Sequence, residues 1–243
     1  MNFRSKATFA TFAFLAAALA LPGKAAEFTV TPVRIFMTPR DRAVAVTVTN
    51  DGNEEIVMQA DLYDWKQSAD GTDQLVLTED MILSPPILKV PPKSRQVVRL
   101  ARLVPPSLDA EQTYRLIVRE VPEARPQADL SLQLSLAFSL PVFITPPGAK
   151  RSLACQVERG GPDTVKAICT NAGRAYAQLR TFELLNSGGE KIAVRESGGY
   201  ILPTIRRTFE ITRSAGPIAA GKVKLQVGLD DGTVQTFEGN LPE

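Results

Sequence analysis

The chain contains no histidine and only two cysteines, Cys155 and Cys169. Without histidine, the commonest general base and the commonest zinc ligand of proteins are missing. The sequence also lacks the G-x-S-x-G, P-loop and G-x-G-x-x-G patterns that mark hydrolases, phosphate-binding loops and dinucleotide-binding folds. We therefore expect no catalytic residue, no metal site and no cofactor.

An excess of charge of one sign is lacking as well. The 28 Lys and Arg residues nearly balance 26 Asp and Glu residues, which gives a net charge of +2. No basic run with interleaved aromatic residues occurs, so we expect no nucleic-acid partner. With 44% apolar residues, 243 residues suffice for one large or two ordinary folded domains.

Long apolar runs are missing except near the N-terminus. There Arg4 and Lys6 precede an uncharged stretch from Ala7 to Leu21, and small residues follow at Gly23 and Ala25. This pattern predicts a secretory signal peptide over residues 1–25, cleaved after Ala25. The alternative is a retained membrane anchor, for which about 15 apolar residues are short. We expect an exported protein with no membrane span in its mature part.

Both cysteines lie in the segment SLACQVERGGPDTVKAICTNAG, on either side of a turn signal at residues 160–163. Folding a hairpin about this turn brings Cys155 and Cys169 almost opposite each other, at a separation that fits a disulfide. We predict that they are bonded. A redox-active pair is the alternative, but there is no C-x-x-C spacing.

Most of the mature chain consists of short β-type runs separated by Asp-Gly, Pro-Pro and Gly-Gly turns. About seven such runs precede residue 145, the number typical of an immunoglobulin-like sandwich. The stiff segment Pro146-Pro147-Gly148 follows, and then a second set of runs. We predict two β-sandwich domains, at residues 26–147 and 148–243.

One run, ADLSLQLSLAFSLP at residues 128–141, alternates strictly between apolar and small or polar residues. Fully extended it would span about 35 Å, more than an ordinary strand of 5–6 residues. It is either a core strand or a strand that offers its apolar face and its edge to another protein. Its apolar positions, bracketed by Pro126 and Pro141, are Leu130, Leu132, Leu134, Leu136, Phe138 and Leu140.

Several segments occur in an order that resembles periplasmic pilus chaperones of the PapD type over essentially the whole mature length. They are Thr31-Pro32-Val33-Arg34-Ile35, Val48-Thr49-Asn50-Asp51-Gly52, residues 84–92 with Val98-Arg99-Leu100, and residues 114–122, followed by the alternating run. The resemblance implies an all-β fold with two immunoglobulin-like domains set at an angle, and an inter-domain cleft.

In that family, the last strand of the first domain completes a pilus subunit whose own immunoglobulin-like fold lacks a strand. The resemblance therefore implies that Leu132, Leu134 and Leu136 are core donor residues, flanked by Leu130 and Phe138. It also implies a periplasmic location, pilus subunits as partners, and delivery to an outer-membrane usher.

The family also binds the subunit's C-terminal carboxylate with two cations in the cleft. Arg34 stands at the position of the family's arginine, but Pro141 stands where a lysine is usual. If the strands pair about a turn near Arg125, Arg115 lies opposite Ala137–Phe138, and we take Arg115 as the replacement.

The alternative for either arginine, and for Arg99 and Arg119, is a surface or structural ion pair. This departure suggests a divergent branch, such as the archaic one.

Two other classes of function remain as alternatives. A two-domain adhesin or structural subunit would use the alternating run as ordinary core. A periplasmic hydrolase, such as a glycosidase with two carboxylates, would need a carboxylate pair. The candidates, in the segments Asp61–Asp64 and Asp230–Asp231, stand in strand or turn contexts, where we expect solvated side chains.

Overall fold

The computed structural model describes residues 28–122, 135–213 and 216–243. In these ranges the regular elements are all β-strands, so the predicted all-β class is confirmed. The strands are β1 (Phe28–Thr31), β2 (Ile35–Met37), β3 (Ala43–Asn50), β4 (Ile56–Gln67), β5 (Asp73–Leu77), β6 (Met81–Ser84), β7 (Ile87–Val90), β8 (Arg95–Arg102), β9 (Gln112–Glu120), β10 (Ala137–Ile144), β11 (Leu153–Arg159), β12 (Thr164–Asn171), β13 (Ala177–Asn186), β14 (Lys191–Arg195), β15 (Gly199–Ile201), β16 (Arg206–Thr212), β17 (Gly221–Leu229) and β18 (Val234–Leu241).

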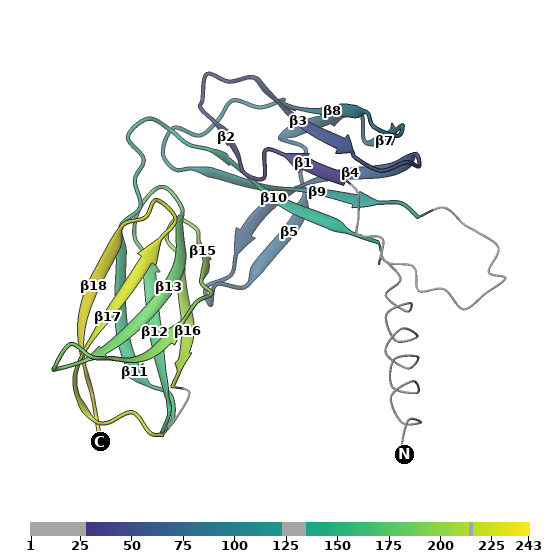
Figure 1. Ribbon diagram of the computed structural model, residues 1–243. Coiled ribbons are helices and arrows are strands. Elements are labelled where there is room, and N and C mark those ends of the chain that lie inside the picture. Colours follow the sequence, from purple (N-terminus) through teal and green to yellow (C-terminus); the bar gives the residue numbers. More distant parts are fainter. Residues whose placement is uncertain (1–27, 123–134, 214–215) are drawn as a thin grey trace, which may run out of the picture.

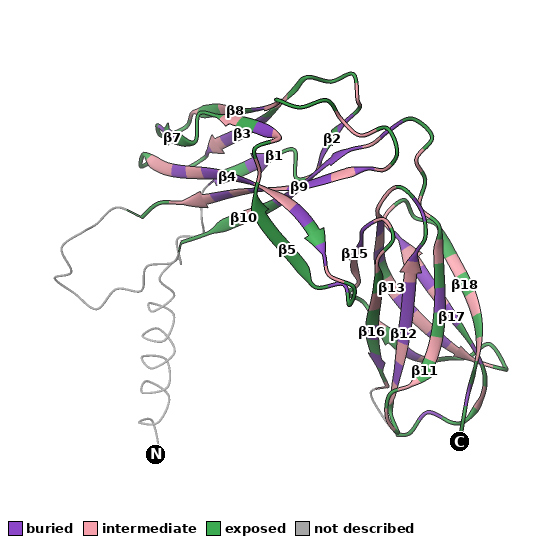
Figure 2. Cartoon of the chain, turned by 180° about the vertical axis from the view of Figure 1, so that it is seen from behind, coloured by how far each residue is buried: buried purple, intermediate pink, exposed green. Residues whose placement is uncertain are grey.

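The first ten strands form a sandwich of two sheets (Figure 1). One sheet has the order β1-β3-β8-β6, and the other has the order β2-β10-β9-β4-β5, with β7 also paired to β4. Alternate residues such as Val98 and Leu100 in β8 and Leu116 and Val118 in β9 are fully buried between the sheets. The exposed exception is β5, which Figure 2 shows as exposed along its whole length.

The segment that contains β1 and β2, residues 28–37, is divided between the two sheets. Strand β1 pairs with β3, whereas Ile35 of β2 pairs in parallel with Val142 of β10. The chain crosses between the sheets at Pro32, after a cis peptide bond, because proline cannot donate a hydrogen bond to a sheet ladder. Arg34 lies at the end of this crossing.

The second sandwich contains sheets of order β11-β12-β16 and β14-β13-β17-β18, with β15 paired to β13. Phe182 and Phe209 are buried in its core, with ring centroids 4.7 Å apart. Cys155 pairs directly with Cys169 in the β11–β12 ladder, at a Cα–Cα distance of 4.1 Å. The predicted disulfide is therefore confirmed.

The two domains lie at an angle to each other (Figure 1), and an aromatic cluster joins them. Trp65 and Phe143 of the first domain are buried against Leu202 and the half-buried Tyr176 and Tyr200 of the second. The two sandwiches are thus packed on each other through apolar side chains as well as through the chain connection.

Hydrogen bonds fix the same junction. The side chain of Gln67 donates to the Tyr200 carbonyl oxygen at 3.0 Å and accepts from the Leu202 backbone N–H at 2.9 Å. On another side, the buried Glu111 carboxylate accepts from the Thr145 hydroxyl at 2.7 Å and from the Tyr176 backbone N–H at 2.9 Å. Burial raises the pKa of Glu111 above its ordinary value.

The first sandwich has more strands than the seven expected, because prolines divide its runs into short pieces such as β2 and β7. Strand β10 ends at Ile144 and β11 begins at Leu153. The boundary at residues 147/148 therefore falls in a connection between strands, and the division into 26–147 and 148–243 stays a prediction.

Candidate functional site

The alternating run ends in β10, which forms part of the first domain's larger sheet. Leu140 is buried, and the half-buried Phe138 packs edge-to-face on Phe28 with ring centroids 5.4 Å apart. Leu136, one step further from the core on the same face, is 41% exposed. Apolar side chains therefore leave the core at Leu136. The predicted donor residues Leu130, Leu132 and Leu134 lie outside the described residues.

Pro141 does not end this strand, contrary to its predicted bracketing role. Strand β10 continues through Pro141 to Ile144. A proline is tolerated in a strand where one edge is unpaired, and β2 pairs with β10 only from Val142 onward. The strand thereby reaches the junction between the domains.

Arg115 lies directly opposite Pro141 in the ladder between β9 and β10. The expected position opposite Ala137–Phe138 is wrong, because those two residues pair with Arg119 and Val118. The midpoint between paired positions is 128 instead of about 125. Each residue of β9 therefore pairs with a residue several positions later in β10 than we expected. Arg115 thus faces the position where the resemblance leads one to expect a lysine.

The Arg115 guanidinium lies over the Trp65 ring. Its Cζ atom is 3.7 Å from the centroid of the Trp65 ring and 5.4 Å from the centroid of the Tyr200 ring. Among the described residues it has no hydrogen-bond or ion-pair partner. Burial lowers the pKa of Arg115, and the nearby Asp73 carboxylate opposes this only in part. A half-buried cation without a paired anion is a favourable place for an anionic ligand.

Arg34 is held by the second domain. Its Nη1 atom donates to Asp230 Oδ2 at 2.7 Å and to Gln178 Oε1 at 2.9 Å. Burial of Arg34 disfavours its charge, but the hydrogen bond to Asp230 and the nearby negative charge outweigh it, so the pKa of Arg34 is raised. The Arg34 side chain remains 31% exposed.

Asp230 was expected to be solvated, and this expectation is wrong. Its side chain is only 10% exposed, because the β17–β18 turn packs against the first domain at Arg34. The Tyr176 hydroxyl donates to the same carboxylate at 3.3 Å. The adjacent Asp231 is more exposed and pairs with Arg151 at 2.6 Å.

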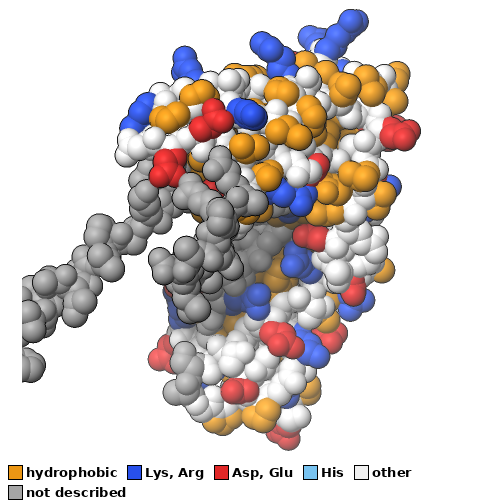
Figure 3. Space-filling model, turned by 90° about the vertical axis from the view of Figure 1, so that its right-hand side faces the viewer, with side chains coloured by type: hydrophobic (Ala, Val, Ile, Leu, Met, Phe, Trp, Pro, Cys, Tyr) orange, Lys and Arg blue, Asp and Glu red, His pale blue; other side chains and the backbone are white. Residues whose placement is uncertain are grey.

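Aromatic rings form the floor between the two arginines. Phe143 is stacked on Tyr176 at 4.0 Å between centroids and on Phe36 at 5.8 Å. At one end of this group of rings, the Arg115 guanidinium lies over Trp65. At the other end, the Arg34 Cζ atom lies 5.9 Å from the centroid of the Phe36 ring. Figure 3 shows Lys and Arg side chains gathered where the surface is hollowed between the domains.

The other arginines named from the sequence lie elsewhere. Arg119 pairs with Asp61 across the β4–β9 ladder at 2.5 Å, the structural ion pair that was the alternative for it. Arg99 is exposed in β8 and pairs with Ala45 of β3, in the sheet that does not contain β9 and β10. Neither contributes to the arrangement around Trp65 and Phe143.

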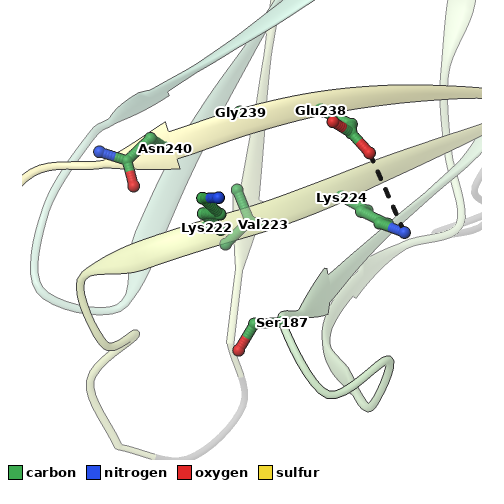
Figure 4. Close-up of a pocket in the computed structure, with 7 residues that line it drawn as sticks. All are labelled: Ser187, Lys222, Val223, Lys224, Glu238, Gly239 and Asn240. Carbon is green, nitrogen blue, oxygen red and sulfur yellow. Dashed lines mark ion pairs between the residues drawn. The ribbon is translucent and has the colours of Figure 1, made fainter.

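A separate hollow of about 510 Å³ lies on the second domain, along β17 and β18 (Figure 4). Its lining includes Lys222 and Asn240, and Lys224 faces Glu238 at 4.0 Å. The described residues around it show no buried unpaired group, so the inter-domain arginines remain the candidate site.

The fold is thus two immunoglobulin-like sandwiches packed on each other, with Arg34 and Arg115 at their junction. A family model described as "Pili and flagellar-assembly chaperone, PapD N-terminal domain" matches residues 27–150. The chain therefore belongs to this family of pilus-assembly chaperones, as the sequence resemblance indicated. A search of curated proteins found no match.

Solved structures of the same fold include the complex of the chaperone CsuC with the tip adhesion subunit CsuE, from archaic chaperone-usher Csu pili of Acinetobacter baumannii. One chain of that complex is 20% identical, with 89% of this chain and 99% of that chain covered and a TM-score of 0.66. The chaperone CupB2 of Pseudomonas aeruginosa is 20% identical over 88% and 100%, with a TM-score of 0.57. The E. coli chaperone DraB is 22% identical over 88% and 96%, with a TM-score of 0.55.

These comparisons establish the chaperone family and the two-domain fold. Within the described residues there is no helix of the length and apolarity needed to cross a membrane. The predicted signal peptide at residues 1–25 lies outside the described residues.

Proposed function

We propose that this protein is a periplasmic chaperone that folds, caps and delivers pilus subunits by donor-strand complementation. One observation carries the proposal: Arg115 is half-buried on Trp65 and has no ion-pair partner among the described residues, and it lies beside β10, whose apolar side chains become exposed at Leu136. A chaperone that offers a strand and anchors a carboxylate needs both features in one place.

The donor strand would be the continuation of β10 toward the N-terminal side of Leu136. A subunit that lacks a strand exposes an apolar groove and an unpaired edge, and both favour aggregation. Leu132, Leu134 and Leu136, flanked by Leu130 and the half-buried Phe138, would fill the groove while the backbone pairs with the open edge. Each fully buried side chain contributes about 1.5–3 kcal/mol before the costs of association.

Arg34 and Arg115 would bind the C-terminal carboxylate of the subunit. The two lie on either side of β10, since Arg115 pairs with Pro141 and Ile35 pairs with the next residue, Val142. A guanidinium can bind a carboxylate through two parallel hydrogen bonds, which also fixes the register of the bound strand. The carboxylate would be met by cations from both neighbours of the donor strand.

The partners follow from this role. They are pilus subunits with incomplete immunoglobulin-like folds, and the outer-membrane usher that receives them. CsuC, from an archaic chaperone-usher system, shares the fold. This similarity and the substitution of Pro141 for the usual lysine favour the archaic branch.

The proposal is tested by measuring capture of a purified subunit by wild type, Arg34→Ala, Arg115→Ala and the double variant. Losing one charge-assisted contact costs about 1.5–3 kcal/mol, so each single variant should bind about 10- to 150-fold more weakly. The double variant should lose less than the sum, because both arginines act on one anion. Arg99→Ala, which removes an exposed arginine of the other sheet, is the matched control.

A subunit with an amidated C-terminus provides the second arm. It should bind wild type about as weakly as the native subunit binds the double variant. If Arg34→Ala and Arg115→Ala bind the native subunit as tightly as Arg99→Ala does, or if amidation changes nothing, the carboxylate anchor is wrong.

A further inference from the structure

Within the part of the chain that the structure describes, only the Nη1 nitrogen of the Arg34 guanidinium forms hydrogen bonds. Nη1 carries two N–H groups, and its two recorded bonds go to Asp230 Oδ2 at 2.7 Å and Gln178 Oε1 at 2.9 Å. Among the described residues, Nε and Nη2 have no hydrogen-bond partner. These two atoms form one edge of the guanidinium, the edge that can bind a carboxylate through two parallel bonds.

The two groups that hold Nη1 are themselves fixed in the second domain. Gln178 lies in β13, paired with Tyr200 of β15, and its carbonyl oxygen accepts from the Asp230 backbone N–H at 3.1 Å. The Asp230 carboxylate is nine-tenths buried and also accepts from the Tyr176 hydroxyl. Arg34 belongs to the first domain, but both groups that accept its hydrogen bonds belong to the second. The orientation of the Arg34 side chain therefore depends on the second domain.

Asp230 brings a charge as well as an acceptor. Its Oδ2 atom contacts Arg34, and its Oδ1 atom lies 4.0 Å from Arg151 Nη1. A second carboxylate arriving at Arg34 would meet this resident negative charge nearby, partly offset by Arg151. Like charges repel more strongly where burial reduces solvent screening. The hydrogen bond and the charge of Asp230 should therefore act on a bound carboxylate in opposite directions.

We propose that Asp230 and Gln178 are positioning residues, which hold Arg34 by Nη1 so that its Nε–Nη2 edge meets the subunit's terminal carboxylate. The charge of Asp230 keeps this anchor weaker than an isolated arginine would be, which favours release of the subunit on delivery. The inference rests on the proposed carboxylate anchor and adds the two residues that orient it.

The test compares Asp230→Asn, Asp230→Ala and Gln178→Ala by the ratio of dissociation constants for amidated and native subunit. Asp230→Asn keeps an acceptor oxygen and removes the charge, so the ratio should stay at the wild-type value or rise. Asp230→Ala removes both, and Gln178→Ala removes the second acceptor. Each of these two should lower the ratio about tenfold.

The ratio separates positioning from a merely structural role, because altered domain packing would weaken binding of both subunit forms alike. The proposal is overturned if Asp230→Ala and Gln178→Ala keep the wild-type ratio, or if Asp230→Asn loses discrimination as fully as Asp230→Ala. Should the Asp230 variants fail to fold, Gln178→Ala decides alone. A wild-type ratio near one would instead refute the carboxylate anchor itself.

Discussion

Arg115 of β9 lies directly opposite Pro141 of β10, with the guanidinium of Arg115 on the Trp65 ring. Residues that face each other in an antiparallel pair share one side of the sheet, with Cβ atoms about 4.5–5.5 Å apart. A cation can therefore move from one strand to its neighbour and still reach the same space. The proposed carboxylate anchor therefore does not require a lysine at position 141.

The first prediction exchanges the two positions. Arg115→Ala should lose subunit binding, and adding Pro141→Lys should restore most of it, because the new ammonium starts from the facing position. Affinity for the native subunit measures the rescue. The matched control is Arg115→Ala with Ser139→Lys, which puts a lysine on the same face one step further along β10, opposite Ile117.

Rescue by Pro141→Lys alone is the expected outcome. Equal rescue by both lysines would mean that any positive charge on this face suffices. No rescue by either would mean that Arg115 does not occupy the place of the family's lysine.

The second prediction separates donor residues from core residues on one strand. Leu134→Asp should abolish subunit capture while the chaperone still folds, because a buried unpaired carboxylate in the subunit groove costs several kcal/mol. Leu140→Asp, the same change six residues later in the alternating run, should prevent folding, because Leu140 is only 3% exposed in the domain core. Co-purification with a subunit and the circular-dichroism melt are the two measurements.

The pair of variants also tests the alternative that the whole alternating run is core, as in an adhesin or structural subunit. In that case Leu134→Asp would lose its melting transition and accumulate as poorly as Leu140→Asp. A Leu134→Asp variant that folds and still captures subunits would show that Leu134 is not buried in the subunit groove, which would contradict the donor role.

The third prediction concerns the pH dependence of the domain junction. Burial raises the folded-state pKa of Glu111 above its ordinary value of 4.5. The protonated form is then favoured in the folded protein, so the contribution of Glu111 is full below about pH 4.5. It falls as pH rises through the raised pKa. Thermal unfolding should therefore show that stability falls as pH rises above about 4.5 and levels off above the raised pKa of Glu111.

Glu111→Gln removes this titration while keeping groups that can bond to Thr145 and Tyr176, so its stability should vary less over the same pH range. Glu111→Ala loses both hydrogen bonds and should destabilise the protein by about 2 kcal/mol. Glu158→Gln, an exposed change in β11, is the control. Identical pH profiles for wild type and Glu111→Gln would contradict the prediction.

Much of the fold could be predicted because it depends on local patterns. Short β-type runs separated by turn residues indicated the strands, and the segment AVAVTVTN, which is β3 (Ala43–Asn50), shows the alternation of apolar residues that such a strand requires. The Cys155–Cys169 pairing followed from one hairpin, since the residues on each side of a short turn determine which side chains face each other. The two sandwiches and the family resemblance rest on the same local features.

The candidate site depended on the tertiary structure in three respects. The residue of β10 that faces Arg115 could not be predicted by counting outward from a turn. The connection from Glu120 to Ala137 is long, and no residue pattern in it identifies the midpoint of the pairing. Asp230 resembles any turn carboxylate until the second domain packs against Arg34. The burial of Glu111 likewise requires both domains. Strand periodicity is a property of neighbouring residues, whereas charge pairing and burial across a junction are decided by residues far apart in the sequence, 196 positions for Arg34 and Asp230 and 65 for Glu111 and Tyr176.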